Sequence, residues 1–488
     1  MDEGIDSGLS SAERQHLMQF GETMLGFLDY DPTDEQNDLI AAFGQFCLLS
    51  PPNSVMLLNG YAGTGKTSMT GALVRTLLYM RRKTILLAPT GRASKVFAEY
   101  SRYPAYTIHR KIYRQKSYNP EYGAFVLNEN KSADTVYIVD EASMIGNSPG
   151  ESSMFGSGRL LDDLIHYVYS GVNCRLILLG DKAQLPPVGF DESPGLSKKV
   201  LEGYGLTVYQ FSLTSVVRQS GGSGILDNAT RIRNAIMMMQ DGTLTQLLPP
   251  KLLLSGYADI EALSSEYLVE RIDDCYSRDG IEETIIITRS NKRAGQFNKG
   301  IRNTLLYRED ELVSGETLLV VKNNYFWSEE YKEIDFIANG EVARVQRVGR
   351  RSERYGFHFA DVTLELPDHE VEVSARVILD TLDSDSPALT SEQSKALYQA
   401  VMNELEGNKR ERHKELRSNG YFCALQVKYG YAVTCHKAQG GQWKNVFIDM
   451  GSIPHDAFST LDFYRWLYTA LTRATKRVYL INSRLEWV

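Results

Sequence analysis

The sequence predicts an α/β protein with two parallel-sheet cores and a smaller β-barrel inserted into the second core. The first observation is a series of short apolar runs, VMLLNG, TILLAP, VYIVDE and RLILLGD, separated by amphipathic segments. Unbroken apolar runs of this length indicate strands buried on both faces, and the segments between them indicate crossover helices. A second series, TIIITR, YAVTCH, NVFIDM and RVYLIN, follows later in the chain and predicts the second core.

The inserted barrel is predicted from a change in pattern between residues 321 and 429. Short alternating stretches such as EVARVQRV and ADVTLEL, with turn residues between them, indicate small barrel strands. Within this region residues 390–418 are expected to be a solvated helical segment that begins with a capping box of Thr390 and Gln393. The expected divisions are a leader at 1–30, a first core at 31–211, a second core at 212–320 and 430–488, and the barrel at 321–429.

Composition sets the broad class of protein. A chain of 488 residues with 43% hydrophobic content is too long for one core of ordinary size. No apolar run is long enough to cross a membrane and the start is acidic, so we expect a cytoplasmic protein. Five scattered cysteines suit a reducing compartment. The net charge of -8 does not decide for or against nucleic acid, because phosphates are neutralised by local Lys and Arg.

The stretch GYAGTGKTS carries the clearest chemical signal. It completes the pattern G-x-x-x-x-G-K-[ST] between a predicted strand and a predicted helix. Glycines let backbone N–H groups turn toward a β-phosphate, Lys66 reaches the β- and γ-oxygens, and Thr67 ligates magnesium. The pattern therefore predicts a nucleotide site with Mg²⁺. Its expected binding residues are Gly60, Gly63, Gly65, Lys66, Thr67 and Ser68.

Two acidic residues follow the third predicted strand of the first core. VYIVDEAS puts Asp140 and Glu141 at a strand end, where ligands bind in parallel sheets. Asp140 would hold magnesium and Glu141 would polarise the attacking water as a general base. The alternative is that the pair caps the following helix. A later strand, LILLGD, leads to Gln184 in a loop stiffened by two prolines.

Read in order, the motifs GYAGTGKT, LAPTGRAS, YTIHR, VDEAS, GDKAQLPPVG, VVRQ, TCHKAQGGQW and YTALTRA resemble those of superfamily 1B helicases, in particular the RecD-like and Dda-like branch. The resemblance extends from Pro32 to Ile481. It implies two RecA-like cores with ATP and Mg²⁺ between them, single-stranded DNA across their top, a β-hairpin wedge in the first core and an SH3-like barrel in the second. It also implies an ATP-dependent 5′-to-3′ DNA helicase, and the direction comes from the resemblance alone.

The resemblance gives roles to further residues at the nucleotide. Gln36 in DPTDEQ looks like the glutamine that reads adenine, although Thr33 and Gln36 also fit a helix cap and both roles can hold. Gln184 looks like the residue that couples the γ-phosphate to DNA. Arg218 in VVRQ and Arg473 in YTALTRA look like the two arginines that the second core offers to the γ-phosphate.

A helical pattern supports the assignment of Arg473. The apolar residues of RWLYTALTRATKRV fall on one stripe of the predicted helix, and Arg473 lies off that stripe, free to face a cleft. The stripe consists of Leu467, Ala470, Leu471 and Ala474. The alternative for Arg473, as for Arg218, is an ordinary surface arginine.

The resemblance also points to residues that would contact DNA. They are Pro89, Thr90, Thr107, His109, Thr434, His436 and Lys437. Small hydroxyls and backbone groups suit a motor, because they hold phosphates without reading sequence. Both histidines have a structural alternative, and these contacts do not exclude RNA because they do not probe the 2′-OH.

Residues 114–132 lie where the family carries its hairpin wedge, with Tyr122 and Phe125 as candidate tips. Opening one base-pair step costs about 1.4 kcal/mol, and stacking a base on an aromatic ring returns about 1–3 kcal/mol. One aromatic residue is therefore enough. The alternative is that the aromatic ring anchors the hairpin to its own core.

The expected partners are single-stranded DNA and its junctions with duplex, and a single-strand-binding or replication and repair protein is a further candidate. We expect a monomer that does not associate with membranes. Two other functions fit part of the motif set: a translocase that strips proteins from single strands without unwinding, and a P-loop kinase that acts on a small molecule.

Overall fold

The structure, a computed structural model, describes residues 9–115, 125–148, 156–217, 222–331, 334, 336–451 and 453–486. The chain divides into two compact units with the main boundary between residues 221 and 222, and the short segment Thr90–Arg92 is counted with the second unit. Each unit is described separately. In the described part of the chain no helix combines the length and the apolar character needed to span a bilayer.

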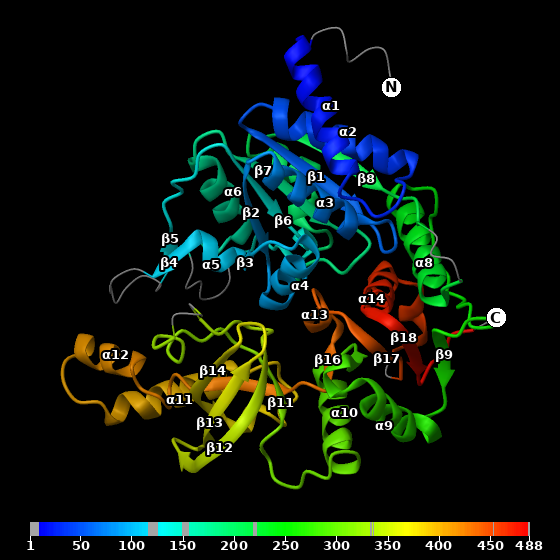
Figure 1. Cartoon of the computed structure of the whole chain (residues 1–488). Coiled ribbons are helices and arrows are strands. Elements are labelled where there is room, and N and C mark those ends of the chain that lie inside the picture. Colours follow the sequence, from blue (N-terminus) through cyan, green and yellow to red (C-terminus); the bar gives the residue numbers. More distant parts are fainter. Residues whose placement is uncertain are drawn as a thin grey trace. The chain divides into compact units, whose positions relative to one another are not determined.

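The first unit is built on a six-stranded parallel sheet (Figure 1). The strand order is β3-β2-β6-β7-β1-β8, and the central strands are buried on both faces, as the apolar runs predict. Its strands are β1 (Ser54–Gly60), β2 (Lys83–Ala88), β3 (Ala105–Thr107), β6 (Thr135–Val139), β7 (Arg175–Gly180) and β8 (Thr207–Leu213). Its helices are α1 (Ser11–Leu25), α2 (Asp34–Leu49), α3 (Lys66–Tyr79), α4 (Gly91–Ser101), α5 (Ile108–Ile112), α6 (Leu160–Ser170) and α7 (Lys198–Glu202).

The expected boundaries of the first core need two corrections. The predicted leader contains α1, and Phe20 and Met24 of this helix are fully buried in the same apolar cluster as the sheet, so α1 is part of the core. At the other end β8 pairs with β1 through Leu213, two residues beyond the expected limit. Both segments are less apolar than the central strands, and the predicted boundaries therefore left them out.

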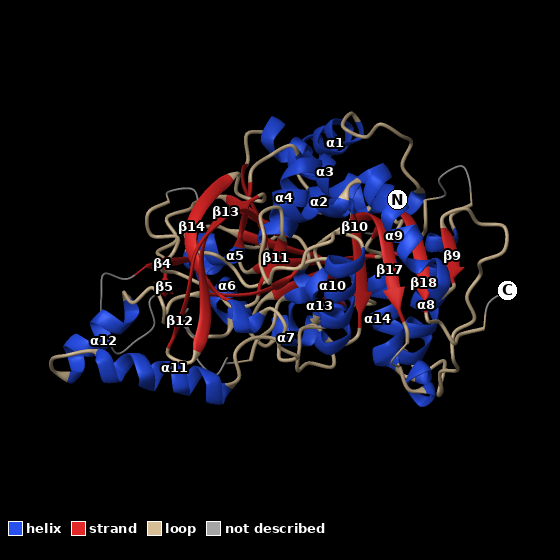
Figure 2. Ribbon diagram, turned by 90° about the horizontal axis from the view of Figure 1, so that it is seen from below, coloured by secondary structure: helices blue, strands red, loops and turns tan. Residues whose placement is uncertain are grey.

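The second unit contains a five-stranded parallel sheet in the order β16-β10-β17-β18-β9. Strands β10, β17, β18 and β9 lie side by side in Figure 2. Four of its strands are the predicted ones, and β9 adds an edge strand that the apolar runs did not reveal. The strands are β9 (Ile260–Leu263), β10 (Thr284–Thr288), β16 (Ala432–Thr434), β17 (Trp443–Asp449) and β18 (Ala474–Ile481). The helices are α8 (Gly224–Gln240), α9 (Leu268–Asp279), α10 (Asn291–Thr304), α13 (Cys435–Ala438) and α14 (Leu461–Leu471).

A closed barrel of five strands is inserted between α10 and β16. Its strands are β11 (Thr317–Val320), β12 (Val342–Arg354), β13 (Phe357–Leu366), β14 (Val371–Ile378) and β15 (Leu425–Tyr429). β11 pairs with both β12 and β15, which closes the barrel. The barrel therefore begins at residue 317, and not at 321 as expected.

The helical segment between β14 and β15 is two helices, α11 (Ser391–Glu404) and α12 (Lys409–Arg417). The capping box of Thr390 and Gln393 is present. The expected solvated segment packs one face on the barrel, because Leu397 and Val401 share an apolar cluster with Phe359 of β13. α11 ends where Leu405 takes an extended conformation, and Gly407, in the link between the two helices, has a positive φ of 101°.

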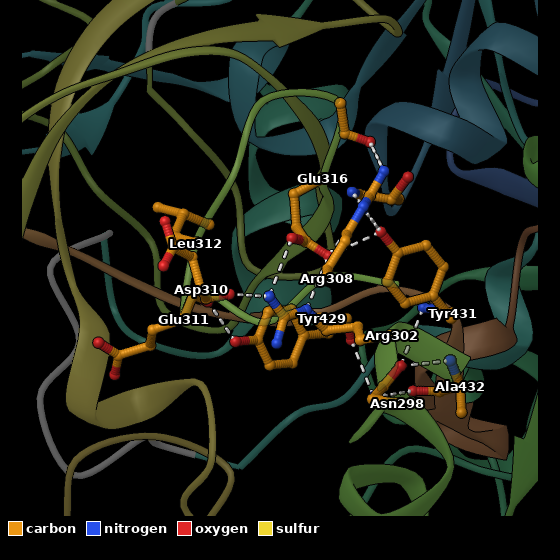
Figure 3. A network of polar contacts seen from close by, with 12 residues as sticks. Asn298, Arg302, Arg308, Asp310, Glu311, Leu312, Glu316, Tyr429, Tyr431 and Ala432 are labelled. Carbon is orange, nitrogen blue, oxygen red and sulfur yellow. Dashed lines mark hydrogen bonds and ion pairs between the residues drawn. The ribbon is translucent and has the colours of Figure 1, made fainter. Parts of the chain in front are cut away.

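A buried network of charges joins the barrel to the second sheet (Figure 3). The Glu316 side chain, directly before β11, has 0% exposure and accepts from Arg302 Nε at 3.0 Å and Arg308 Nη1 at 2.9 Å. The hydroxyl of Tyr431, directly before β16, donates to the same carboxylate at 2.8 Å. Glu316 therefore connects the start of the barrel at β11 with α10, with the loop after α10, and with the residue that leads from the barrel into β16.

We predict that Glu316→Ala destabilises this junction strongly. The substitution leaves Arg302 buried without its carboxylate, and breaking a buried ion pair from one side costs about 3–5 kcal/mol. Urea unfolding should show a loss of this size, whereas Glu282→Ala, which removes the exposed partner of Arg344, should cost at most about 1 kcal/mol. Equal unfolding midpoints for the two variants would contradict the role of Glu316.

Candidate nucleotide and nucleic-acid sites

Parallel pairing brings three predicted segments to one edge of the first sheet. β6, β7 and β1 are neighbours in the strand order, so their carboxyl ends lie side by side. The phosphate loop follows β1, Asp140 follows β6, and the loop with Gln184 follows β7. Lys66 Nζ lies 3.4 Å from Asp140 Oδ1, so the structure brings these two predicted residues together.

The phosphate loop depends on its glycines. Gly63 and Gly65 have φ angles of 77° and 80°, in the left-handed region that favours glycine. A Cβ on Gly65 would lie 2.6 Å from Gln36 Nε2, and one on Gly60 would lie 2.8 Å from the Lys66 side chain. A larger side chain at Gly60 or Gly65 would therefore require a neighbouring side chain to shift. α3 begins at Lys66, as the motif predicts, with Thr67 and Ser68 in its first turn.

The charge of Lys66 is set by its surroundings. Burial alone would lower the pKa of its ammonium group, but the carboxylates of Asp140, Glu141 and Asp181 outweigh burial and raise the pKa. Lys66 is therefore a permanent cation at neutral pH. This is the charge that a β- or γ-phosphate needs as a partner.

Glu141 has a strained backbone at the end of β6. Its φ of 51° lies in the left-handed region, which is uncommon for a residue other than glycine and clusters at functional sites. It starts the short 3-10 helix Ala142–Met144 without a side-chain capping bond. The alternative of an acidic pair that caps the next helix is therefore not what Glu141 does in this structure.

Gln184 has a buried polar atom that suggests a missing ligand. The side chain is buried, and within the described residues its Oε1 atom has no hydrogen-bond partner. Buried polar atoms are nearly always bonded, so such an atom at the edge of a sheet indicates a partner that the protein does not supply. A bound nucleotide with its water is a partner of this kind.

Gln36 fills one of the two roles that the sequence left open, the helix cap. Thr33 and Gln36 form a reciprocal capping box at the start of α2. The Gln36 Nε2 group also donates to the carbonyl of Thr64 in the phosphate loop at 3.2 Å. The helix cap is thus present, and the same amide contacts the phosphate loop, whereas contact with adenine stays a prediction.

A hollow of about 310 Å³ lies beside the start of α3. Thr67 and Ser68 line it together with Tyr30, Tyr100 and Arg75. The chemistry of Thr67 and Asp140 fits Mg²⁺, because both offer oxygen atoms and Mg²⁺ at nucleotides takes few protein ligands beside the phosphates. The described residues contain no cluster of three or more His, Cys, Asp or Glu that suits a metal ion.

Tyr122 and Arg218 lie outside the described residues. The residue before Arg218, Val217, donates its N–H to Gly63 O of the phosphate loop at 2.9 Å. The segment predicted to be the wedge includes an antiparallel pair of short strands, β4 (Tyr113–Gln115) and β5 (Phe125–Leu127).

Phe125 is not an exposed tip. It is the first residue of β5 and is 7% exposed. The alternative named above, that an aromatic ring anchors the hairpin to its own core, describes Phe125. The physical reason is burial: an apolar side chain beside a core is stabilised by leaving water.

Arg473 differs from its expected setting. α14 ends at Leu471 and β18 begins at Ala474, so Arg473 lies in the turn between them and not on a helical face. It is 4% exposed, and its guanidinium donates to Thr469 O at 3.2 Å and Gly441 O at 3.3 Å. The apolar stripe of a helix therefore does not explain where the Arg473 side chain points, and that part of the prediction is wrong. Its guanidinium is held within the second unit.

The predicted DNA contacts of the first core follow β2 and β3. Pro89 and Thr90 directly follow β2, and Thr107 is the last residue of β3, where its hydroxyl caps α5. Burial lowers the pKa of His109 to about 4. His109 is therefore neutral at pH 7 and brings no positive charge to a phosphate.

The predicted DNA contacts of the second core are at the end of β16. Thr434 is the last residue of this strand, and His436 and Lys437 lie in α13. Burial lowers the pKa of both side chains, that of Lys437 to about 8. Lys437 is therefore the main carrier of positive charge among these three residues at neutral pH.

Comparison with family models gives two matches. The model of an AAA domain matches residues 33–248. The model of a UvrD-like helicase C-terminal domain matches residues 429–481. The first match spans the phosphate loop, Asp140 and Gln184, and the second spans Thr434 and Arg473.

Two named proteins are similar in sequence. The ATP-dependent RecD2 DNA helicase of Deinococcus radiodurans is 24% identical over 447 residues, which cover 89% of this chain and 47% of that protein. The ATP-dependent DNA helicase dda of Enterobacteria phage T4 is 27% identical over 304 residues, which cover 59% of this chain and 62% of that protein. The chain thus spans less than two thirds of the length of either relative.

Among solved structures, the Pif1 helicase from Bacteroides in complex with ADP-AlF3 and ssDNA is similar at 15% identity and a TM-score of 0.44, over 93% of each chain. The two family models cover the ordered motifs at both ends of the series. Together with the two relatives, these matches support a superfamily 1B helicase.

Proposed function

We propose that the chain is an ATP-dependent DNA helicase that moves 5′-to-3′ along single-stranded DNA and separates duplex. The observation that carries the proposal is the pairing of Lys66 with Asp140, 3.4 Å apart at the edge of a parallel sheet, in a chain with the superfamily 1B motif series. Two relatives named ATP-dependent DNA helicases support the activity. The direction rests on the family resemblance.

In this proposal the first core holds the nucleotide. Backbone N–H groups of the phosphate loop bind the β-phosphate, and the Lys66 ammonium balances charge on the β- and γ-oxygens. Gln36 contacts adenine, and Glu141 accepts the proton of the attacking water. Mg²⁺, held by Thr67 and Asp140, would supply charge neutralisation on the phosphates during transfer.

The second core completes the site in the same proposal. Arg218 and Arg473 stabilise the charge on the γ-phosphate, and such arginines are worth about 10³–10⁵ in rate. For Arg473 this requires that its bonds to Thr469 and Gly441 are exchanged for bonds to phosphate. Hydrolysis then depends on closure of the cores, and Gln184 links the γ-phosphate to the DNA contacts.

Single-stranded DNA is the proposed track. Thr90 and Thr107 of the first core and Thr434 and Lys437 of the second hold backbone phosphates without reading sequence. The hairpin that begins at β4 is the proposed wedge. Alternating grip by the two sets of contacts, driven by nucleotide turnover, moves the strand.

Two other functions make different predictions. A P-loop kinase uses the same phosphate loop but has no reason to respond to DNA. A translocase responds to DNA and displaces streptavidin from a biotinylated strand, yet it leaves duplex intact. An RNA motor is distinguished by replacing oligo(dT) with oligo(U).

We predict that oligo(dT) strongly stimulates ATP hydrolysis and that Lys66→Ala abolishes it. The variant loses the cation that balances the phosphate charge, so kcat should fall by at least about 10²–10³-fold. Binding of a fluorescent oligo(dT) should be largely unchanged, because Lys66 belongs to the nucleotide site. Lys198→Ala, at a side chain that is 53% exposed on α7 of the same unit, is the matched control and should keep wild-type turnover.

Hydrolysis that does not respond to oligo(dT) would favour a kinase and contradict the proposal. Turnover in Lys66→Ala equal to that of Lys198→Ala would remove the assignment of the phosphate loop.

The direction of movement gives a second prediction. A duplex with a single-stranded 5′ tail should be separated in the presence of Mg-ATP, and the same duplex with a 3′ tail should not. Strand separation is followed by gel electrophoresis with trapping of the released strand. Activity on the 3′-tailed substrate alone would contradict the direction.

A further inference from the structure

Tyr100 contacts the predicted magnesium ligand but has no role in the mechanism above. It lies near the end of α4, and its hydroxyl donates to Asp140 Oδ2 at 2.6 Å. The ring stacks on Phe97, with ring centroids 5.1 Å apart. A Cβ on Gly71 of α3 would lie 2.9 Å from the Tyr100 carbonyl oxygen, so α4 packs closely on α3 at this point. The hydroxyl is therefore held in place from two sides.

The two oxygens of the Asp140 carboxylate have different partners. Oδ1 accepts from the N–H of Glu141 at 2.8 Å and lies 3.4 Å from Lys66 Nζ. Oδ2 accepts from Tyr100. The terminal torsion of an aspartate is soft, so donors on both oxygens are needed to hold the plane of the carboxylate. Tyr100 holds the oxygen that Lys66 and Glu141 do not.

The same tyrosine borders the space beside the other magnesium ligand. Tyr100 and Thr67 both line the hollow of about 310 Å³ next to the start of α3.

We propose that Tyr100 is a positioning residue for the magnesium site, which it serves by fixing the orientation of the Asp140 carboxylate. The inference rests on the proposed function, because it takes Asp140 and Thr67 as the residues that hold Mg²⁺. Carboxylates that bind metals are themselves hydrogen-bonded, and loss of such a partner typically lowers metal affinity by about 10–100-fold. Tyr100→Phe removes only the hydroxyl and keeps the ring on Phe97.

The test is a Mg²⁺ titration of the binding of a fluorescent ADP to the full chain. In Tyr100→Phe the half-saturating Mg²⁺ concentration should rise by about 10–100-fold, with nucleotide binding in EDTA unchanged. Tyr79→Phe, at an α3 residue that is 67% exposed, is the matched control and should titrate like the wild type. Thermal unfolding of both variants checks that the fold is intact.

A second variant keeps the inference falsifiable if Tyr100→Phe is unstable. Incorporation of 3-fluorotyrosine at position 100 retains the hydroxyl and should give a Mg²⁺ dependence close to that of the wild type. A half-saturating Mg²⁺ concentration in Tyr100→Phe that is equal to or lower than that of Tyr79→Phe overturns the inference and leaves the proposed function standing. Absence of Mg²⁺-dependent nucleotide binding in the wild type overturns both.

Discussion

Parallel pairing of β1, β6 and β7 is the constraint on which the nucleotide site depends. Each strand contributes one short segment after its carboxyl end, and the three segments meet only because the strands are neighbours with the same direction. The phosphate loop, the Asp140 carboxylate and the buried Gln184 come from distant parts of the sequence. Lys66 and Gln184, for example, are 118 residues apart. The sheet thus assembles a site that no single segment contains.

The Asp140 carboxylate is a buried negative charge that hydrogen-bond donors from several segments surround. It is mostly buried, and burial of an ionised carboxylate is costly unless donors surround it. Lys66, the N–H of Glu141 and the hydroxyl of Tyr100 supply those donors. Glu316 is a parallel case in the second unit, where two arginines and Tyr431 satisfy a fully buried carboxylate. In both units a buried acid holds together segments that are distant in sequence.

Sequence patterns predicted the parts of the fold that are most apolar. The eight predicted core strands are present, because strands buried on both faces read as unbroken apolar runs. The edge strands β3, β8 and β9 were not predicted, because they are short or partly exposed. The phosphate loop and Asp140 follow from local motifs, whereas Tyr100 belongs to no motif and its contact depends on how α4 packs on α3. Arg473 was misplaced on a helix because its apolar neighbours continue into β18.

The central claim is that a nucleotide held by the first core is hydrolysed with an arginine of the second. The most direct measurement is ATP turnover by Arg473→Ala in the presence of oligo(dT), set beside its affinity for Mg-ATP and its thermal midpoint. The account predicts a fall in kcat of about 10³–10⁵-fold with Mg-ATP affinity little changed. Arg484→Ala, at an exposed arginine of the same unit, should behave like the wild type. A folded Arg473→Ala protein with wild-type, DNA-stimulated turnover would contradict the account.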